Sequence, residues 1–440
     1  MTGKKLRKPG AEGLRLMFRS FGYRNYRLFF GGQSLSLIGT WIQRIATPWL
    51  VYHLTNDAFL LGVVGFAGQI PTFLIAPFAG VLTDRWNKYR LLVATQVLAM
   101  IQALVLAILF FTGSITIWMI VILSIFLGIV NAFDVPARQS FVIELVGKKE
   151  DIGNAIALNS SMVNGARLLG PSIAGMVIAF AGEGVCFLAN GISYVFVITS
   201  LLLMKVKPHA RRSKKIKVIS ELKEGFRYAY GFPPIRYIIL LLALVSLVGM
   251  PYTVLMPVIA KDVLHGGAHT FGFLMGASGF GALTGAFFLA SKKDAYGLER
   301  LIPVAAVVFG LGLVLFSFSR SFSLSMGLMI FIGLGMMLQM ALSNTILQTV
   351  VEDDKRGRVM SFYTMAFMGT APFGSIIAGS LAKSIGAPYT MMAGGILCVV
   401  GALLYSRKLA EIKSLIAPLF AKSGPAVPVV SDEPLSKPLK

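Results

Sequence analysis

The stretch GARLLGPSIAG, residues 165–175, spaces its glycines five positions apart inside an apolar run and contains Gly165, Gly170, Pro171 and Gly175. A stretch with the same glycine spacing, GTAPFGSIIAG, occupies residues 369–379, which is 204 positions later. The same offset relates Gly182 to Gly386. In a chain of 440 residues, a fixed offset of this length predicts two copies of one structural half.

The composition is that of a membrane protein. The chain is 56% hydrophobic and 14% charged, whereas soluble domains carry about 25% charged residues. Its two cysteines, Cys186 and Cys398, lie in apolar runs, so no disulfide framework is predicted. The first apolar run is about as long as a full span and has no small-residue cleavage site, so it is not a signal peptide.

Twelve apolar runs are each about long enough to cross a bilayer. Only helices satisfy the backbone within such a run without closing a barrel, so the chain is predicted to be an all-α membrane protein with twelve transmembrane helices. The runs lie at about 26–52, 58–83, 91–112, 116–134, 153–181, 185–204, 236–260, 270–291, 301–319, 325–350, 359–382 and 387–405.

Lysine and arginine predict the orientation. If the spans alternate, 36 of the 41 basic residues lie on one side, three (Lys261, Arg320 and Lys383) lie on the other, and two lie inside spans. This asymmetry predicts a cytoplasmic location for both termini and for the central linker. It also explains the net charge of +22 as a signal for topology that attracts anionic lipid head groups, and nucleic acid is not needed as a partner.

The two six-span halves therefore have the same orientation, which makes them parallel pseudo-repeats. In the linker, Ile219, Leu222, Phe226 and Tyr230 fall at helical spacing and predict a short amphipathic helix on the membrane surface. The last 20 residues have the composition of a disordered tail. The predicted parts are an N-terminal segment 1–25, a first half 26–204, a linker 205–235, a second half 236–405 and a tail 406–440.

Two motifs on this framework resemble the major facilitator superfamily of secondary transporters. GVLTDRWNKYR, residues 80–90, is similar to the superfamily's loop pattern between spans two and three and departs from it at Asn87, where glycine is usual. The stretch 165–175 is similar to the motif associated with exporters. Wider similarity to the branch that contains the bacterial enterobactin exporter, the transmembrane secretion effectors, lies in residues 39–43, 134–139, 154–160 and 356–360.

The resemblance implies that the first motif is a conformational latch. Asp84 would pair with Arg138 and face the start of span eleven near Ser361, where the helix dipole is positive. These contacts would hold the cytoplasmic side closed. The alternative is a solvated turn whose charges serve topology alone. The latch residues are Gly80, Asp84, Arg85, Lys88 and Arg138.

The glycine-rich stretch of span five predicts close helix neighbours, because small residues let backbones approach in lipid. Glycines in span eight and in span two are the expected partners, so contacts five-to-eight and two-to-eleven should join the halves. The alternative is generic packing of small residues within one half. The residues of the exporter motif are Gly165, Gly170, Pro171 and Gly175.

Polar side chains form stripes on spans one, four and ten. A polar face in lipid is costly, so these stripes face either protein or water. The resemblance implies that spans one, four, seven and ten line a central cavity that holds the substrate, whereas the alternative is that the polar groups only cross-link helices. The cavity candidates are Gln33, Ser36, Thr40, Gln43, Arg44, Asn131, Arg167, Gln339 and Asn344.

Arg44 and Arg167 are the two charges deep in predicted spans, which makes them functional candidates. They either attract an anionic or catechol-bearing substrate or pair with Asp57, glutamine side chains and helix carbonyls. No carboxylate lies at mid-depth, although a proton-driven antiporter needs a group that titrates. Asp134 is the best remaining candidate for proton coupling.

Together these features predict an efflux carrier of the bacterial cytoplasmic membrane. It would export a small amphipathic molecule such as a siderophore or drug by alternating access, with protons as the coupling ion. We expect a monomer that needs neither a cofactor nor a metal ion. The rival predictions are an uptake carrier or lipid flippase of the same fold and, more distantly, a membrane enzyme or sensor. The sequence has no P-loop and no HExxH motif that would favour an enzyme.

Overall fold

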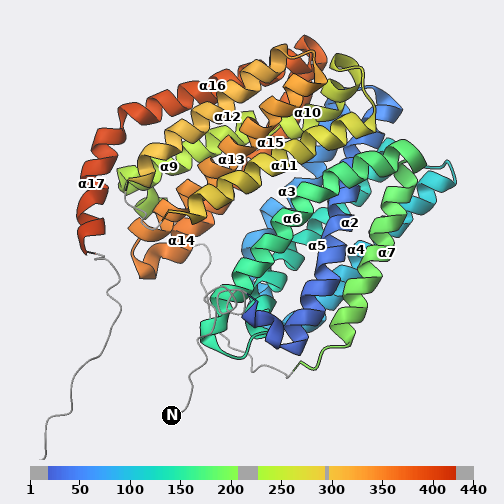
Figure 1. Ribbon diagram of the computed structural model, residues 1–440, viewed down its shortest axis with the longest axis horizontal. Coiled ribbons are helices and arrows are strands. Elements are labelled where there is room, and N and C mark those ends of the chain that lie inside the picture. Colours follow the sequence, from blue (N-terminus) through green and yellow to red (C-terminus); the bar gives the residue numbers. More distant parts are fainter. Residues whose placement is uncertain (1–17, 207–225, 293–296, 423–440) are drawn as a thin grey trace, which may run out of the picture.

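The computed structural model describes residues 18–206, 226–292 and 297–422, and it consists of helices arranged in two groups (Figure 1). The first group, here the N half, begins with a short 3₁₀ turn, η1 (Arg19–Gly22). Its long helices are α2 (Arg24–Thr55), α3 (Ala58–Arg85), α4 (Lys88–Phe111), α5 (Ile117–Glu144), α6 (Lys149–Ala181) and α7 (Glu183–Leu202).

The second group, the C half, contains two spans that are interrupted by π-helical turns. The seventh span consists of α9 (Pro233–Leu244), η2 (Val245–Gly249), α10 (Tyr252–Val258) and η3 (Ile259–Val263). The eleventh consists of α14 (Asp353–Thr364), η5 (Met365–Gly369) and α15 (Ala371–Ile385). The remaining elements are α11 (Ala268–Ala290), η4 (Leu298–Arg300), α12 (Leu301–Phe318), α13 (Phe322–Val350), α16 (Ala387–Arg407) and α17 (Leu409–Lys422).

The internal repeat is visible in the helix boundaries. Helix α6 runs over Lys149–Ala181, and the eleventh span runs over Asp353–Ile385, so both of its ends are displaced by the predicted 204 positions. The glycines that follow these spans, Gly182 and Gly386, have φ angles of 81° and 88°. Because that region strongly favours glycine, the same residue type is needed to turn the chain at both places.

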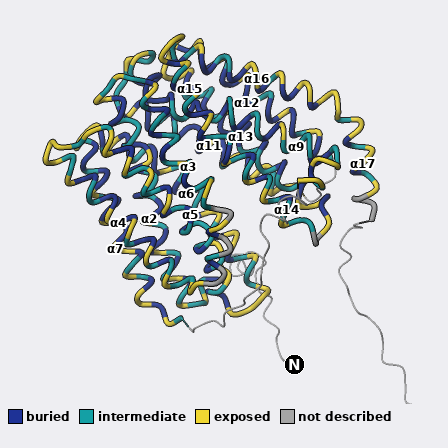
Figure 2. The backbone as a smooth tube through the Cα atoms, turned by 180° about the vertical axis from the view of Figure 1, so that it is seen from behind, coloured by how far each residue is buried: buried dark blue, intermediate teal, exposed yellow. Residues whose placement is uncertain are grey.

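The described part of the chain has eleven helices that are long and apolar enough to cross a membrane. Helix α2 is not among them although it is 32 residues long, because its polar stripe lowers its mean hydropathy. Large apolar side chains such as Phe180, Ile108 and Phe287 are exposed on the outer surface, and exposed residues follow the outward sides of the helices in Figure 2. An outer surface of apolar side chains is favourable in contact with lipid. The chain is therefore an all-α, multi-pass membrane protein, as predicted.

One predicted boundary is wrong. The fourth apolar run was expected to end near residue 134, but α5 continues through Pro136 to Glu144. Hydropathy marks where the apolar surface ends, whereas helical hydrogen bonds continue beyond it, and one proline removes a single donor. Asp134 and Arg138 therefore lie within a continuous helix and do not mark its end.

The two ends of the molecule differ in how the halves meet. We call the end with the start of α2 and the end of α7 the linker side, and the opposite end, with the α2–α3 turn, the far side. The halves lie side by side toward the far side and spread apart toward the linker side (Figures 1 and 2).

Close helix packing joins the halves as predicted. Helix α6 packs against α11, and α15 packs against α3, which are the five-to-eight and two-to-eleven contacts. A Cβ atom added to Gly175 would lie 3.0 Å from Cα of Gly272, and one added to Gly379 would lie 2.9 Å from Cα of Gly62. Both contacts therefore depend on glycine at the crossing, and the repeat places them symmetrically.

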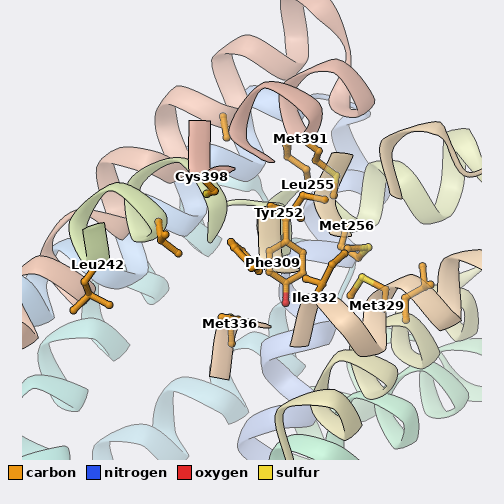
Figure 3. Close-up of a cluster of buried hydrophobic side chains, with 14 of the residues drawn as sticks. Leu242, Tyr252, Leu255, Met256, Phe309, Met329, Ile332, Met336, Met391 and Cys398 are labelled. Carbon is orange, nitrogen blue, oxygen red and sulfur yellow. The ribbon is translucent and has the colours of Figure 1, made fainter. Parts of the chain in front are cut away.

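The buried apolar side chains form two clusters. One lies within the N half, and the other runs through the C half and continues into the far-side part of the N half. In the C half, Tyr252 packs edge-on against Phe309 with ring centroids 6.1 Å apart, and Met336 and Cys398 are buried beside them (Figure 3). Cys186 is buried in the N half, and both cysteines are free thiols, as predicted.

The linker and the C-terminal segment each contribute a helix to the described structure. Most of the predicted amphipathic helix of the linker, like the predicted disordered tail, lies outside the described residues, but residues 226–231 are helical. Helix α17 was not predicted. It covers the C half with Ile412 and Ile416, which are both buried.

Candidate functional site

Three polar contacts join the halves on the far side, and we call them the far-side lock. The Tyr52 hydroxyl donates to the Asp262 carboxylate. Nζ of Lys261 donates to Oδ1 of Asn56 at 2.7 Å, and Nζ of Lys383 donates to Oδ2 of Asp57 at 2.7 Å. In each contact the N half supplies one partner and the C half supplies the other.

Local structure places the N-half partners of the lock. Asn56 ends α2 with a φ of 47°, a left-handed conformation that asparagine tolerates. The next residue, Asp57, caps α3 by accepting a hydrogen bond from the backbone N–H of Phe59 at 2.8 Å. Its other oxygen bonds Lys383, and this contact is the main reason that the pKa of Asp57 lies below its usual value.

The C-half partners come from π-helical and terminal turns. Lys261 and Asp262 lie in η3, where the π-helical turn holds an extra residue. Lys383 lies in the last turn of α15. Beside the lock, Nδ1 of His53 contacts Oε1 of the buried Glu183 at 3.0 Å within the N half.

The two intramembrane arginines meet on one aromatic ring. The guanidinium carbon of Arg44 lies 4.9 Å from the centroid of the Trp41 ring, and that of Arg167 lies 6.0 Å from it. Nη2 of Arg167 also lies 4.0 Å from Sδ of Met336, which belongs to α13 of the C half. Trp41 itself packs on Gly170 of the exporter motif. We call Trp41, Arg44 and Arg167 the arginine cluster.

No carboxylate among the described residues pairs with either arginine of the cluster. The predicted alternative partners are engaged elsewhere, because Asp57 holds Lys383 and Gln43 bonds two amides of its own half. Both guanidinium carbons lie within 6.0 Å of the centroid of the same ring, so two like charges lie near each other. The cluster thus carries two uncompensated positive charges.

Much of the predicted polar stripe of span one faces the interior of the N half. Gln43 donates to Oε1 of Gln102 at 2.9 Å and accepts from Nδ2 of Asn190 at 2.7 Å, which links α2, α4 and α7. Gln33 and Ser36 are also buried. These contacts agree with the cross-linking alternative, while a role for these residues in substrate binding stays a prediction.

The other cavity candidates occupy varied surroundings. The Thr40 hydroxyl donates to the Ser36 carbonyl of its own helix at 2.9 Å. Asn344 accepts from Nε2 of Gln348 at 2.9 Å, also within one helix. Asn131 is half-buried, and Gln339 is buried with its Nε2 donor unpaired among the described residues.

Asp134 is buried and well satisfied. Its Oδ1 accepts from the Thr95 hydroxyl at 2.9 Å and from Nε2 of Gln96 at 2.6 Å. Its Oδ2 lies 3.6 Å from Nε of Arg138, one turn further along α5. Arg138, the predicted partner of Asp84, therefore contacts a carboxylate of its own helix in this conformation.

The rest of the predicted latch is only partly described. Lys88 pairs with Glu144 at 2.8 Å, which ties the start of α4 to the end of α5. Gly80, Asp84 and Arg85 lie in the last turns of α3, but their side-chain surroundings lie outside the described part of the structure. The latch stays a prediction.

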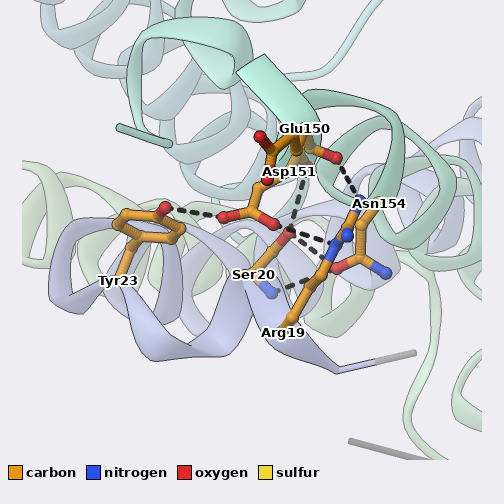
Figure 4. A network of polar contacts seen from close by, with 6 residues as sticks. All are labelled: Arg19, Ser20, Tyr23, Glu150, Asp151 and Asn154. Carbon is orange, nitrogen blue, oxygen red and sulfur yellow. Dashed lines mark hydrogen bonds and ion pairs between the residues drawn. The ribbon is translucent and has the colours of Figure 1, made fainter. Parts of the chain in front are cut away.

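An N-terminal strap docks on the start of α6 (Figure 4). Nε of Arg19 lies 2.9 Å from Oδ1 of Asp151, the Tyr23 hydroxyl donates to Oδ2 of the same carboxylate at 2.6 Å, and Ser20 bonds Asn154. The hydrogen bond to Asp151 raises the pKa of Tyr23. Asn154 belongs to a stretch that the sequence singled out by resemblance alone.

Sequence reasoning missed the far-side lock and the place of Trp41. A signal for the lock was present, because Lys261 and Lys383 are two of only three basic residues assigned to the far side. Basic residues on the side that has few of them are candidates for specific pairing. Trp41 lies in residues 39–43, which the family resemblance singled out, but nothing in its spacing predicted two arginines around its ring.

Comparison with known proteins is consistent with this architecture. The family described as transmembrane secretion effector matches residues 18–430. The chain is 26% identical to the staphyloferrin A transporter of Staphylococcus aureus, with 88% of this chain and 97% of that protein covered. It is 22% identical to macrolide efflux protein A of Streptococcus pyogenes, with 87% and 96% covered.

Among solved structures, the fold is similar to a bacterial homolog of the human lysosomal transporter Spinster, described as inward-facing and unoccupied. The TM-score is 0.68 at 12% identity, with 90% of this chain and 98% of that chain covered. At this identity the likeness concerns the fold.

Proposed function

The chain belongs to the transmembrane secretion effector family and is a major facilitator transporter, and we propose that it is an efflux carrier of the bacterial cytoplasmic membrane. It exports a small amphipathic molecule, of the kind represented by siderophores and drugs, by alternating access. The relatives named above, a siderophore transporter and a macrolide efflux protein, support this choice of cargo.

One observation carries the proposal: the far-side lock closes the end of the molecule that the charge distribution places outside the cell. Lys261 and Lys383 bond the N half, and the glycine crossings of α6 with α11 and α15 with α3 reinforce that closure. The linker side, where the halves spread apart, carries the basic residues that favour the cytoplasm. This conformation is the one that receives cargo from the cell.

The opposite conformation needs a closure on the linker side. Asp84 and Arg138 form it in this proposal, with Gly80, Arg85 and Lys88 shaping the turn. Arg138 would then exchange its contact with Asp134 for one with Asp84. Because Arg138 contacts Asp134 in one conformation and Asp84 in the other, protonation of Asp134 releases Arg138 and so favours the latch. Protons are accordingly the proposed coupling ion, and Asp134 is their proposed site.

The direction of transport is tested in inverted membrane vesicles, in which the linker side faces the bath. Ethidium and carboxyfluorescein are the probes, one an aromatic cation and the other an aromatic anion. Uphill accumulation of either dye that collapses with a proton uncoupler supports efflux. Accumulation in right-side-out vesicles alone supports the uptake carrier, and movement of labelled lipid without either dye supports the flippase.

A further inference from the structure

The arginine cluster has a charge that the protein leaves uncompensated. Several other arginines of the described chain have polar partners, for example Arg138 with Asp134 and Arg320 with the carbonyls of Ser317 and Ser319. Within the described residues, the contacts of Arg44 and Arg167 are the face of Trp41 and the sulfur of Met336. The face of an aromatic ring and a thioether sulfur both attract a cation, but neither carries the negative charge that a carboxylate would supply.

The cluster lies deep in the membrane. Arg44 is 20 residues from the start and 11 residues from the end of α2, which is about 30 Å and about 16 Å along the helix axis. Arg167 is close to the middle of α6. Charges at this depth face a protein-enclosed polar space, because facing lipid is strongly unfavourable.

The position between the halves makes the cluster available to a cargo. Trp41 and Arg44 come from α2, and Arg167 comes from α6, whereas Met336 comes from α13 of the C half. Arg44 is exposed although its neighbours Gln43 and Ile45 are buried. Its guanidinium group therefore points away from the core of the N half.

We propose that the arginine cluster binds the cargo through a carboxylate, and that the cargo is an organic anion with a flat or aromatic part that packs on Trp41. This inference rests on the proposed transport function and names its substrate class. A guanidinium group presents paired donors that match the two oxygens of a carboxylate. An anion at this place neutralises two repelling cations, whereas a cationic drug adds a third.

The site contacts both halves and therefore changes when they rock. Arg167 touches Met336 only while α6 and α13 are close. Backbone atoms of Arg167 also pack against Gly279 of α11, where an added Cβ would lie 3.0 Å from the Arg167 carbonyl oxygen. Movement of α11 and α13 past α6 alters the surroundings of Arg167 and leaves Arg44 and Trp41 with the N half. The anion is thus held by the N half and released as the C half moves.

The first test measures the local charge without any transport. The chain has four tryptophans, and Trp49→Phe, Trp86→Phe and Trp118→Phe leave Trp41 as the only tryptophan. We expect the ratio of iodide quenching to caesium quenching of Trp41 to be higher in this protein than in its Arg44→Gln/Arg167→Gln variant. An unchanged ratio overturns the proposal.

The second test measures the cargo preference. In purified protein, Arg44→Gln and Arg167→Gln should each weaken carboxyfluorescein binding on the order of tenfold or more, because each removes a charged hydrogen bond. Ethidium binding should be unchanged or stronger. Arg44→Lys keeps the charge but loses the paired donors, so it should fall between the parent and Arg44→Gln. Arg24→Gln, the same substitution at an exposed position of the same helix, is the matched control.

The outcomes separate this inference from the transport proposal. Binding of carboxyfluorescein that needs both arginines, without any uphill movement, supports the anion site and contradicts efflux. Uphill movement of ethidium that is indifferent to both arginines supports efflux and overturns the anion site. Thermal unfolding of each variant, with Arg44→Lys as the folded reference, separates loss of the site from loss of the fold.

Discussion

Lys383 donates to Asp57 across the junction of the two halves, with Nζ and Oδ2 2.7 Å apart. The pair ties the last turn of α15 to the residue that caps α3, directly above the crossing of Gly379 with Gly62. A charge pair and a glycine crossing therefore act on the same helix pair. Their effects can be measured separately, because one depends on side chains and the other on backbone approach.

Removing the charge pair should shift the population toward the conformation that opens on the far side. The pair is partly exposed, and exposed pairs contribute about 0.2–1 kcal/mol, so Lys383→Gln should change the ratio of the two conformations by up to about fivefold. Spin labels at the exposed residues Ser114 and Ser323 report the separation of the halves, with Cys186 and Cys398 replaced by serine. Lys408→Gln is the control, because Lys408 pairs within the C half. An unchanged distance distribution in Lys383→Gln would contradict the lock.

The same pair should make far-side closure sensitive to acid. Lys383 holds the pKa of Asp57 below its usual value, so the closed conformation binds fewer protons at this site than a conformation in which the pair is separated. Closure is fully supported above about pH 4, the ordinary value for an aspartate, and weakens as the pH falls through the lowered pKa. The spin-label distances should lengthen over that acidic range.

Other ionisable side chains lie in the lock or beside it, so the acid response needs a reference. Tyr52 bonds Asp262, and His53 contacts Glu183 nearby. Asp57→Asn removes the response of Asp57 and leaves these groups in place. The difference between the parent and Asp57→Asn profiles should be confined to the acidic range, and profiles that coincide there would show that Asp57 does not contribute.

The framework of the molecule was predictable from the sequence because it depends on long patterns. Apolar runs locate the spans, and the 204-residue offset located the repeat whose helix ends the structure reproduces at Ala181 and Ile385. Small residues predicted the two helix crossings, since close approach in lipid requires them. Each of these signals is spread over many positions, so a few exceptions do not obscure it.

The site was less predictable because it depends on where single side chains point. A stripe on α2 contains both Gln43, which bonds its own half, and Arg44, which is exposed. Adjacent residues on a helix point about 100° apart, so a stripe several residues wide includes both faces. The π-helical turns η2, η3 and η5 were also missed, because a single extra residue leaves no trace in hydropathy.

Asp134→Asn should abolish proton movement driven by cargo if Asp134 is the coupling group. The amide can still meet Thr95 and Gln96 but cannot carry a proton between the two sides, and it leaves Arg138 without its carboxylate. A pH dye trapped in vesicles with the purified protein measures the flux when cargo is added. Asp57→Asn, which changes a carboxylate of the lock, should keep the flux. Full proton flux in Asp134→Asn would place the coupling group elsewhere.

Substitution by alanine should have different effects at two glycines of the exporter motif. A Cβ on Gly175 would lie 2.8 Å from the carbonyl oxygen of Ala268, whereas one on Gly165 has no neighbour within 4 Å. Gly175→Ala should therefore force α6 away from α11, cost about 1–3 kcal/mol as overpacking, and favour the conformation open on the far side. Gly165→Ala should be neutral or raise stability by up to about 1 kcal/mol through helix propensity. Thermal unfolding and the spin-label distances check both variants, and equal losses from the two substitutions would show that the motif acts through the helix itself and not through its crossing with α11.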